Sequence, residues 1–209
     1  MKLAVFGATG RTGLPLVRQA LAKGYTVKAL VRTPSKLTIE DARLEVIQGD
    51  ATDAAAVERT VEDTDAVLSV LGHAKGSPDD VQTVATRFIV AAMKKHGVKR
   101  IVSLTGAGVS DPQDQPKVSD RIVKFMLKTL SGKVLEDAEN HATVLRNSDL
   151  EWIIVRGPML TDGEHTGVYK STLVGKDSGM RVSRADVADF MLAQLDDDTW
   201  LRKAPMVSY

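Results

Sequence analysis

Three glycines at positions 7, 10 and 13 constrain the fold of this chain more than any other feature. They follow the short apolar run LAVFG at residues 3–7 and lead into a helical pattern over residues 12–23. In a strand–turn–helix unit the first glycine permits the tight turn, the second leaves room for a pyrophosphate, and the third lets the helix lie close to the strand. The turn predicts a dinucleotide-binding βαβ unit, the alternative being glycines needed only for packing.

The rest of the chain repeats this alternation of short apolar runs and helical patterns, which is typical of a doubly wound parallel sheet, the Rossmann-type α/β fold. We expect strands over residues 3–7, 26–31, 44–49, 66–71, 100–105 and 151–156, and helices over 12–23, 54–60, 80–96, 119–147 and 184–195. Residues 204–208 could add an edge strand. Ser183 and Asp186 have the spacing of a capping box at the start of the last helix.

We predict a single NAD(P)-binding domain over residues 1–209, with small C-terminal segments that form a substrate pocket. The least regular stretches, 106–118 and 160–181, follow expected strand ends, where an open α/β sheet places its ligand crevice. They are the candidate pocket walls. Phe125 and Met126 read as helix packing, with a wall for a flat ring as the alternative.

Composition excludes several functions. The chain has no cysteine, so thiolate catalysis and Cys-ligated zinc are excluded. With 28 basic and 27 acidic residues, no broad field favours nucleic acid or an anionic membrane, and we expect neither as a partner. The 4 histidines show no metal-ligand spacing, so no metal is predicted. Without a recognisable signal peptide or a long apolar run, the expectation is a cytoplasmic protein.

The second expected strand indicates which dinucleotide binds. Sites for NAD usually carry an acidic residue there, whereas sites for NADP use Arg or Lys for the 2′-phosphate. This strand ends in VRTPSK, with Arg32 in place of the acid and Lys36 nearby, and Arg11 can approach from the glycine turn. A guanidinium suits phosphate. NADP(H) is therefore the predicted cofactor, unless Arg32 is only a solvated surface residue.

Two further strand ends fit the same site. Asp50, in GDATD, could accept a hydrogen bond from the adenine amino group, and small residues in VLGHAKG let the chain pass beside the ribose and nicotinamide. Asp53 has the alternative role of capping the helix that follows. His73 lies in the loop after the fourth strand, and His141 lies on the long helix; for both, an ordinary surface or capping role is the alternative.

With GATGRTG, VRTPSK, GDATD and LEWIIVRGP, the whole chain resembles an atypical short-chain dehydrogenase/reductase. It is similar to the NmrA-like and NAD(P)H-flavin reductase group, which includes the biliverdin reductase B type. The resemblance implies NADPH-dependent reduction of flavins or tetrapyrroles by direct hydride transfer. It also implies a set of cofactor contacts. The pyrophosphate is assigned to Gly7, Thr9, Gly10, Arg11, Thr12 and Gly13; the 2′-phosphate to Arg32; the adenine to Asp50 and Ala51; and the nicotinamide riboside to Leu71, Gly72, Ser103, Leu104, Thr105, Gly106, Pro158 and Met159.

The departures from this family bear on catalysis. Tyr25, Tyr169 and Tyr209 have no lysine four residues on, so the Tyr-x-x-x-Lys relay of core short-chain dehydrogenases is missing. A serine that commonly follows the threonine after strand five is replaced by Gly106. The catalytic residue is left unknown, with Ser103, Thr105 and His73 as candidates.

The predicted function is an NADPH-dependent reductase that transfers hydride to a flat conjugated acceptor: flavin, tetrapyrrole or quinone. Such an acceptor can take its proton from solvent. The alternative is a non-enzymatic NmrA-like NADP(H) sensor. The expected partner is a small-molecule acceptor, and the expected state is a monomer or a weak homodimer.

Overall fold

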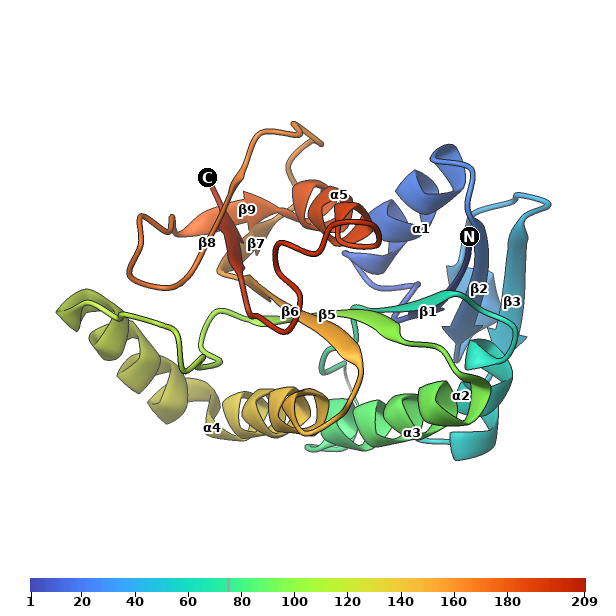
Figure 1. Cartoon of the computed structure of the whole chain (residues 1–209), viewed down its shortest axis with the longest axis horizontal. Helices are drawn as coiled ribbons and strands as arrows, with labels where there is room; N and C mark the ends of the chain where they lie inside the picture. The colour runs from blue at the N-terminus through green and yellow to red at the C-terminus, as the bar shows by residue number, and fades with distance from the viewer. Residues whose placement is uncertain (75) are drawn as a thin grey trace.

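The computed structural model describes residues 1–74 and 76–209, and for residues 118–131 it describes the backbone alone. An eight-stranded sheet in the order β3-β2-β1-β4-β5-β6-β10-β8 forms the centre of the molecule. The strands from β3 to β6 are all parallel. Figure 1 shows α1 and α5 on one face of the sheet and α2, α3 and α4 on the other. The predicted Rossmann-type fold is confirmed.

The central strands and the helices lie close to the ranges expected from the sequence. The strands are β1 (Lys2–Phe6), β2 (Thr26–Val31), β3 (Leu44–Gln48), β4 (Ala66–Ser69), β5 (Arg100–Gly106), β6 (Glu151–Gly157), β7 (Met159–Thr161), β8 (Lys170–Thr172), β9 (Arg181–Ser183) and β10 (Met206–Ser208). The helices are α1 (Gly13–Ala22), α2 (Ala54–Val61), α3 (Val81–His96), α4 (Val118–Arg146) and α5 (Arg184–Ala193), with a short 3₁₀ helix, η1, over Pro34–Lys36.

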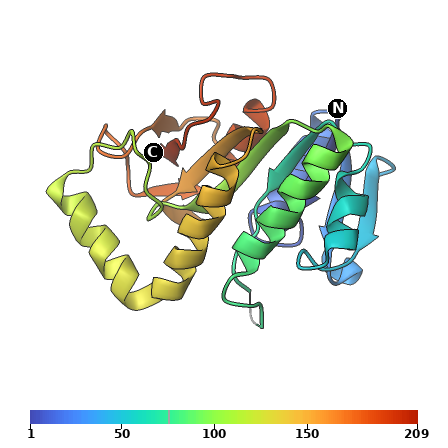
Figure 2. The same ribbon diagram turned by 60° about the horizontal axis from the view of Figure 1, so that its bottom comes forward.

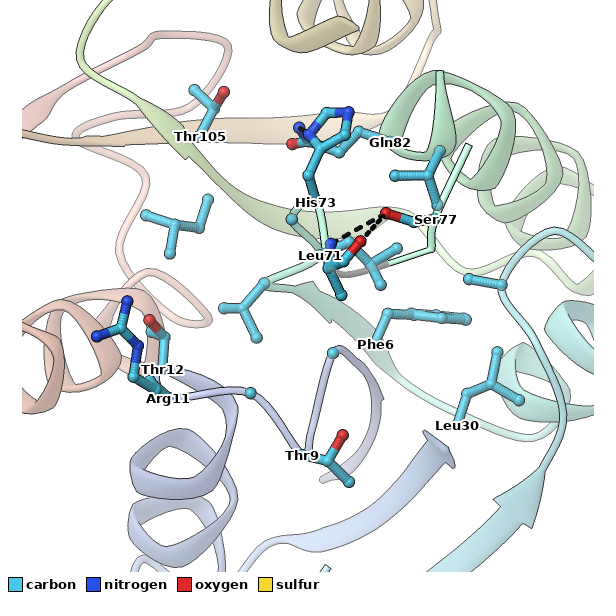
Figure 3. A pocket seen from close by; sticks show the side chains of 18 of the residues that line it. Phe6, Thr9, Arg11, Thr12, Leu30, Leu71, His73, Ser77, Gln82 and Thr105 are labelled. Carbon is cyan, nitrogen blue, oxygen red and sulfur yellow. Dashed lines mark hydrogen bonds between the residues drawn. The ribbon is translucent and has the colours of Figure 1, made fainter. Parts of the chain in front are cut away.

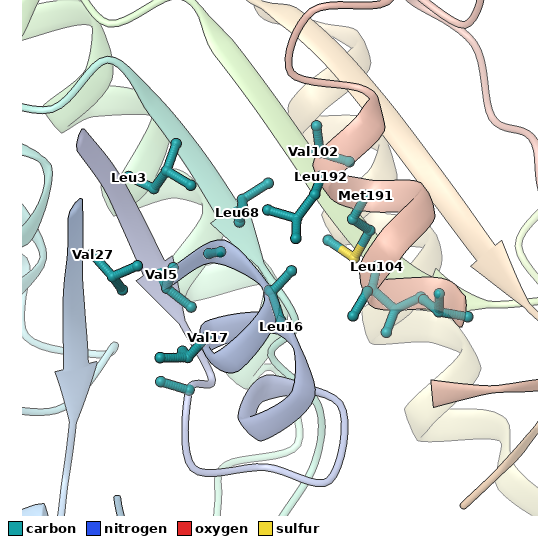
Figure 4. Packing of buried hydrophobic residues seen from close by; sticks show 14 of the residues in the cluster. Leu3, Val5, Leu16, Val17, Val27, Leu68, Val102, Leu104, Met191 and Leu192 are labelled. Atoms are coloured by element: carbon teal, nitrogen blue, oxygen red, sulfur yellow. The ribbon is translucent and has the colours of Figure 1, made fainter. Parts of the chain in front are cut away.

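Two apolar cores hold the three layers together. One, between the sheet and α1 with α5, contains Val5, Leu16, Leu68 and Met191, all fully buried (Figure 4). The other lies between the opposite face and α2, α3 and α4; Figure 2 shows these helices side by side across that face. Because the central strands are covered on both faces, they are apolar on both faces, as in other parallel sheets.

The C-terminal third departs from the sequence-based expectation. Residues 204–208 were expected to add an edge strand, but β10 lies inside the sheet, parallel to β6 and antiparallel to β8, which is the edge. Residues 160–181, expected to be irregular, contain β8 and overlap β7 and β9, which form a separate parallel pair. The side chains of Phe125 and Met126 fall outside the described residues, so the interpretation of them stays a prediction.

The Asp186 carboxylate connects α5 to the loop before β8 and to the C-terminus through hydrogen bonds. Ser183 caps α5 through the N–H of Asp186 at 3.0 Å, as the spacing predicts. In a capping box the side chain of the third helical residue accepts from the N-cap N–H. Here the contact is indirect: the Ser183 N–H donates to the Tyr209 hydroxyl, and this hydroxyl donates to the Asp186 carboxylate. The N–H groups of Thr166 and Gly167 donate to the same carboxylate. Burial alone would raise the pKa of Asp186, but these hydrogen bonds lower it to about 2.

Candidate functional site

A cleft of about 510 Å³ opens at the carboxyl ends of β1, β2, β4 and β5. Figure 3 looks into it, with Arg11 and Thr12 on one side and His73 and Gln82 on another. This is where an open parallel sheet binds its ligands. Among the predicted cofactor residues, the cleft is lined by Gly7, Thr9, Gly10, Arg11, Thr12, Arg32, Asp50, Ala51, Leu71, Gly72, Thr105, Gly106 and Pro158.

The glycines of the first turn differ in what a side chain would meet. Gly7 has φ +84°, and a Cβ there would lie 2.7 Å from the Val70 carbonyl oxygen. A Cβ on Gly13 would lie 2.1 Å from the Gly7 carbonyl oxygen, so both glycines are required by the fold itself. A Cβ on Gly10 would meet only the Gly7 oxygen, at 3.2 Å, and those on Gly72 and Gly106 would meet nothing within 4 Å. Gly72 and Gly106 therefore border open space in the cleft, whereas a side chain on Gly10 would have one tight backbone contact.

Polar groups at the cleft fit the phosphates and amide of a nicotinamide dinucleotide. Helix α1 starts at the glycine turn, and its N-cap residue Thr12 makes no side-chain capping hydrogen bond. A helix N-terminus attracts phosphate through its free N–H groups and its dipole. Thr105 is buried at the end of β5, and its Oγ1 has no hydrogen-bond partner within the described structure. Unpaired buried hydroxyls are rare in native proteins, so Thr105 is suited to a bound polar group.

Arg32 and Asp50, which follow β2 and β3, lie close together at the cleft. The Arg32 Nε lies 3.9 Å from Asp50 Oδ2, and the Arg32 side chain is 53% exposed. Asp50 also accepts hydrogen bonds from the N–H and hydroxyl of Thr52. Burial would raise the pKa of Asp50, but the bonds from Thr52 and the nearby Arg32 charge lower it. Asp53 caps α2 through the N–H of Ala55.

Arg11 pairs with a carboxylate of the C-terminal region. Its Nη1 lies 3.7 Å from Asp162 Oδ2, in the loop after β7. The other oxygen of Asp162 accepts a hydrogen bond from Nη1 of Arg184, at 2.5 Å. Arg184 also lines the cleft. Arg11 and Arg184 thus share one carboxylate, and the assignment of Arg11 to the pyrophosphate stays a prediction.

His73 and Gln82 are held together by a buried carboxylate. Asp137, on α4, accepts hydrogen bonds from the N–H groups of Gln82 and Thr83 at the start of α3, both at 2.9 Å. Nε2 of His73 lies 3.2 Å from the same carboxylate and 2.9 Å from the Asp79 carbonyl oxygen, so this nitrogen donates. Nδ1 of His73 then accepts from the Gln82 amide at 3.4 Å. These contacts fix the orientation of the His73 ring at the cleft.

Ser103 lies outside the cleft lining. Its hydroxyl is buried against Nε2 of His141 at 3.3 Å, while Nδ1 of His141 is hydrogen-bonded to Thr86 at 2.8 Å. Burial lowers the pKa of His141 to about 4. Of the candidate catalytic residues, Thr105 and His73 line the cleft and Ser103 does not. Gly13 also lies behind the lining, beneath the turn.

A second cavity, of about 780 Å³, adjoins the first. It is mostly apolar and lies between the 106–116 segment, α4 and the β7–β9 region. Residues shared by both cavities are Gln82, Gly106, Val134, Gly157 and Pro158. Met159 and Met180 form exposed apolar edges of the second cavity. Both irregular stretches line this cavity, 106–118 through residues between 106 and 116 and 160–181 through residues between 174 and 180.

A buried ion pair supports the wall of the second cavity. Arg156 is fully buried at the end of β6 and donates to both oxygens of Asp114, at 2.6 and 2.8 Å. It also donates to the Val109 carbonyl oxygen. Burial would raise the pKa of Asp114, but the Arg156 hydrogen bonds and charge lower it. Sequence reasoning used this arginine only as part of a family motif.

Sequence reasoning also missed Gln82 and Arg184. Neither stands in a recognisable motif, and each reaches the cleft only through long-range packing. Across the described residues, no group of three or more His, Cys, Asp or Glu side chains could hold a metal ion. In the same part of the chain, no helix has both the length and the apolar character to cross a membrane.

Comparison with known proteins agrees with this geometry. Residues 7–198 match the family model described as NAD(P)H-binding. Reductase pytE of Aspergillus terreus is 26% identical, over 92% of this chain and 90% of that protein. ChuY of Escherichia coli O157:H7, described as an anaerobilin reductase, has a TM-score of 0.83 at 23% identity, over 100% of this chain and 97% of that chain.

A short-chain dehydrogenase/reductase of Veillonella parvula, solved in complex with NADP, has a TM-score of 0.82 at 19% identity, over 100% of this chain and 94% of that chain. The nicotinamide cofactor predicted from the glycine turn is thereby supported at the level of the family. With its sheet, its glycine turn and the family match over residues 7–198, the chain belongs to the NAD(P)H-binding family and is an oxidoreductase.

Proposed function

We propose that the protein uses NADPH to reduce a flat conjugated acceptor, such as a flavin, a tetrapyrrole or a quinone. The observation that carries this proposal is the meeting of two cavities along one wall, at Gly106, Gly157 and Pro158. The polar cleft suits a dinucleotide, and the apolar cavity suits a planar ring system. The description of ChuY as a reductase of a bilin supports an acceptor of this size.

The preference for NADPH is supported by Arg32. Its half-exposed guanidinium stands at the end of β2, where sites for NAD carry an acid. Such a cation can form charge-assisted hydrogen bonds with a 2′-phosphate.

The residues at the junction bind and orient rather than exchange protons. When bound, a reduced nicotinamide supplies the hydride. Hydride transfer requires the donor and acceptor rings within about 3–3.5 Å of each other. Gly106 leaves space for that approach, because a Cβ there would meet no atom within 4 Å. Thr105 holds its unpaired hydroxyl on the cofactor side of the junction.

No tyrosine near the site is suited to proton transfer. The Tyr169 hydroxyl donates to Asp189 at 2.9 Å, and burial and this bond raise the pKa of Tyr169. The Tyr209 hydroxyl donates a hydrogen bond to the Asp186 carboxylate. An acceptor that takes its proton from solvent fits these constraints, whereas alcohol oxidation does not.

The test is NADPH oxidation by the purified protein with FMN, riboflavin, biliverdin and a small quinone, alongside separate measurement of NADPH affinity. We expect turnover with at least one acceptor. Gly106→Leu should abolish turnover by filling the junction, and Tyr169→Phe should leave it intact. Tight NADPH binding with no oxidation by any acceptor would instead indicate a dinucleotide sensor.

A further inference from the structure

Arg184 is the least exposed of the three arginines that line the cofactor cleft. Its side chain is 10% exposed, compared with 73% for Arg11 and 53% for Arg32. A guanidinium withdrawn from water is costly unless an anion compensates its charge. Asp162 provides one carboxylate oxygen, at 2.5 Å from Nη1 of Arg184.

The same carboxylate is shared with Arg11. Its second oxygen lies 3.7 Å from Nη1 of Arg11, which follows Gly10 in the glycine turn. Asp162 is not among the lining residues, whereas both arginines are. Two positive charges thus border the cleft against one negative charge behind them. Gly10 lines the same cleft as the two arginines.

We propose that Arg184 and Arg11 form an anion-binding pair for the pyrophosphate of the bound dinucleotide. Asp162 orients the two guanidinium groups and is the alternative partner of Arg184. A guanidinium presents a planar set of donors that matches phosphate oxygens. The pair acts on a group that NAD and NADP have in common, whereas Arg32 is expected to act on the 2′-phosphate. The inference rests on family membership and is independent of the identity of the acceptor.

The first test compares the dissociation constants of NAD and NADP by calorimetry. Arg184→Gln should weaken both by the same factor, roughly 10- to 100-fold for a lost charge-assisted contact. Arg11→Gln, at an exposed position that tolerates substitution, should also weaken both. Arg100→Gln is the matched control: Arg100 is another poorly exposed arginine paired with carboxylates, at the opposite end of β5, and should change neither constant.

The second test uses inorganic pyrophosphate as the probe and the unfolding temperature as the readout. Pyrophosphate should raise the unfolding temperature of the unmodified protein and should raise that of Arg184→Gln by much less at the same concentration. The rise should be largest for Asp162→Asn, because pyrophosphate then supplies the missing counter-charge of Arg184.

Unchanged affinities for both dinucleotides in Arg184→Gln and Arg11→Gln would overturn the proposal. So would a loss confined to NADP, or equal pyrophosphate shifts in all variants. Failure of every acceptor to be reduced would leave these binding results unaffected.

Discussion

Gly7, Gly10 and Gly13 share one turn but meet different constraints. Side chains at the outer two would collide with backbone atoms at 2.7 and 2.1 Å, whereas Gly10 borders the open cleft. The fold explains the outer two, and the expected ligand explains the middle one. This distinction can be tested with a matched pair of variants.

Gly10→Val should abolish dinucleotide binding and leave the far-ultraviolet circular dichroism close to that of the unmodified protein. Gly13→Val should lower the free energy of unfolding by about 1–3 kcal/mol or more, since overpacking a close backbone contact forces shifts. Titration with NADPH and unfolding in urea measure the two effects. Unchanged NADPH affinity in Gly10→Val would mean that the turn serves packing alone.

Arg32→Asp should reverse the cofactor preference. The change removes a charge-assisted contact to the 2′-phosphate worth about 1.5–3 kcal/mol and supplies a carboxylate for the ribose hydroxyls. The ratio of the NADP and NAD dissociation constants is the measurement. Equal constants for the two dinucleotides in the unmodified protein would contradict the expected role of Arg32.

Local sequence revealed some site residues and concealed others. The glycines and Arg32 sit at fixed positions relative to strand ends, so a pattern identifies them. Gln82 borders both cavities because Asp137, 55 residues away, fixes the start of α3. Arg184 depends on a contact with Asp162, 22 residues away. No short pattern encodes such contacts, which arise only from packing.

Among elements, β6 and the segment that follows β5 are joined by the Arg156–Asp114 pair. Arg156→Met should lower the free energy of unfolding by about 3–5 kcal/mol, because it leaves the Asp114 charge without its partner. Asp114→Asn leaves the fully buried Arg156 charge without its counter-charge and should cost at least as much. Urea unfolding of both variants is the measurement, and an unchanged free energy of unfolding in either variant would contradict a stabilising role for the pair.

The longer elements were predictable because their apolar patterns are long and bounded by glycines or capping residues. Strands β7, β8 and β9 are three residues each, too short to show a period. The sequence predicts a strand over residues 204–208, but it does not predict that β6 and β8 pair with this strand. Strand β10 lies inside the sheet because the β8 segment pairs with its outer side.

At the scale of the molecule, the neutral His141 between α3, α4 and β5 makes folding sensitive to pH. Its folded pKa of about 4 lies below the ordinary value of 6.5, so the unfolded chain binds a proton first as the pH falls. The contribution of neutral His141 to the free energy of unfolding is present above the ordinary pKa of 6.5. It is lost as the pH falls from there to the folded pKa of about 4. Between about pH 7.5 and about pH 5 this amounts to about 2 kcal/mol.

His141→Gln should remove most of this decline, since its amide cannot take up a proton in that interval. Urea unfolding at both pH values, compared with the unmodified protein, is the measurement. Most carboxylates titrate below this interval and contribute little to the difference. An equally steep decline in the variant would assign the pH sensitivity to other groups.

The two cavities draw on different stretches of chain. Apart from the shared wall, the polar cleft is built largely by residues 6–78, while the apolar cavity is built by residues 107–116, the second half of α4, and residues 159–206. A descendant of this sequence can therefore acquire a new acceptor through changes in the second stretch while it inherits its cofactor machinery intact.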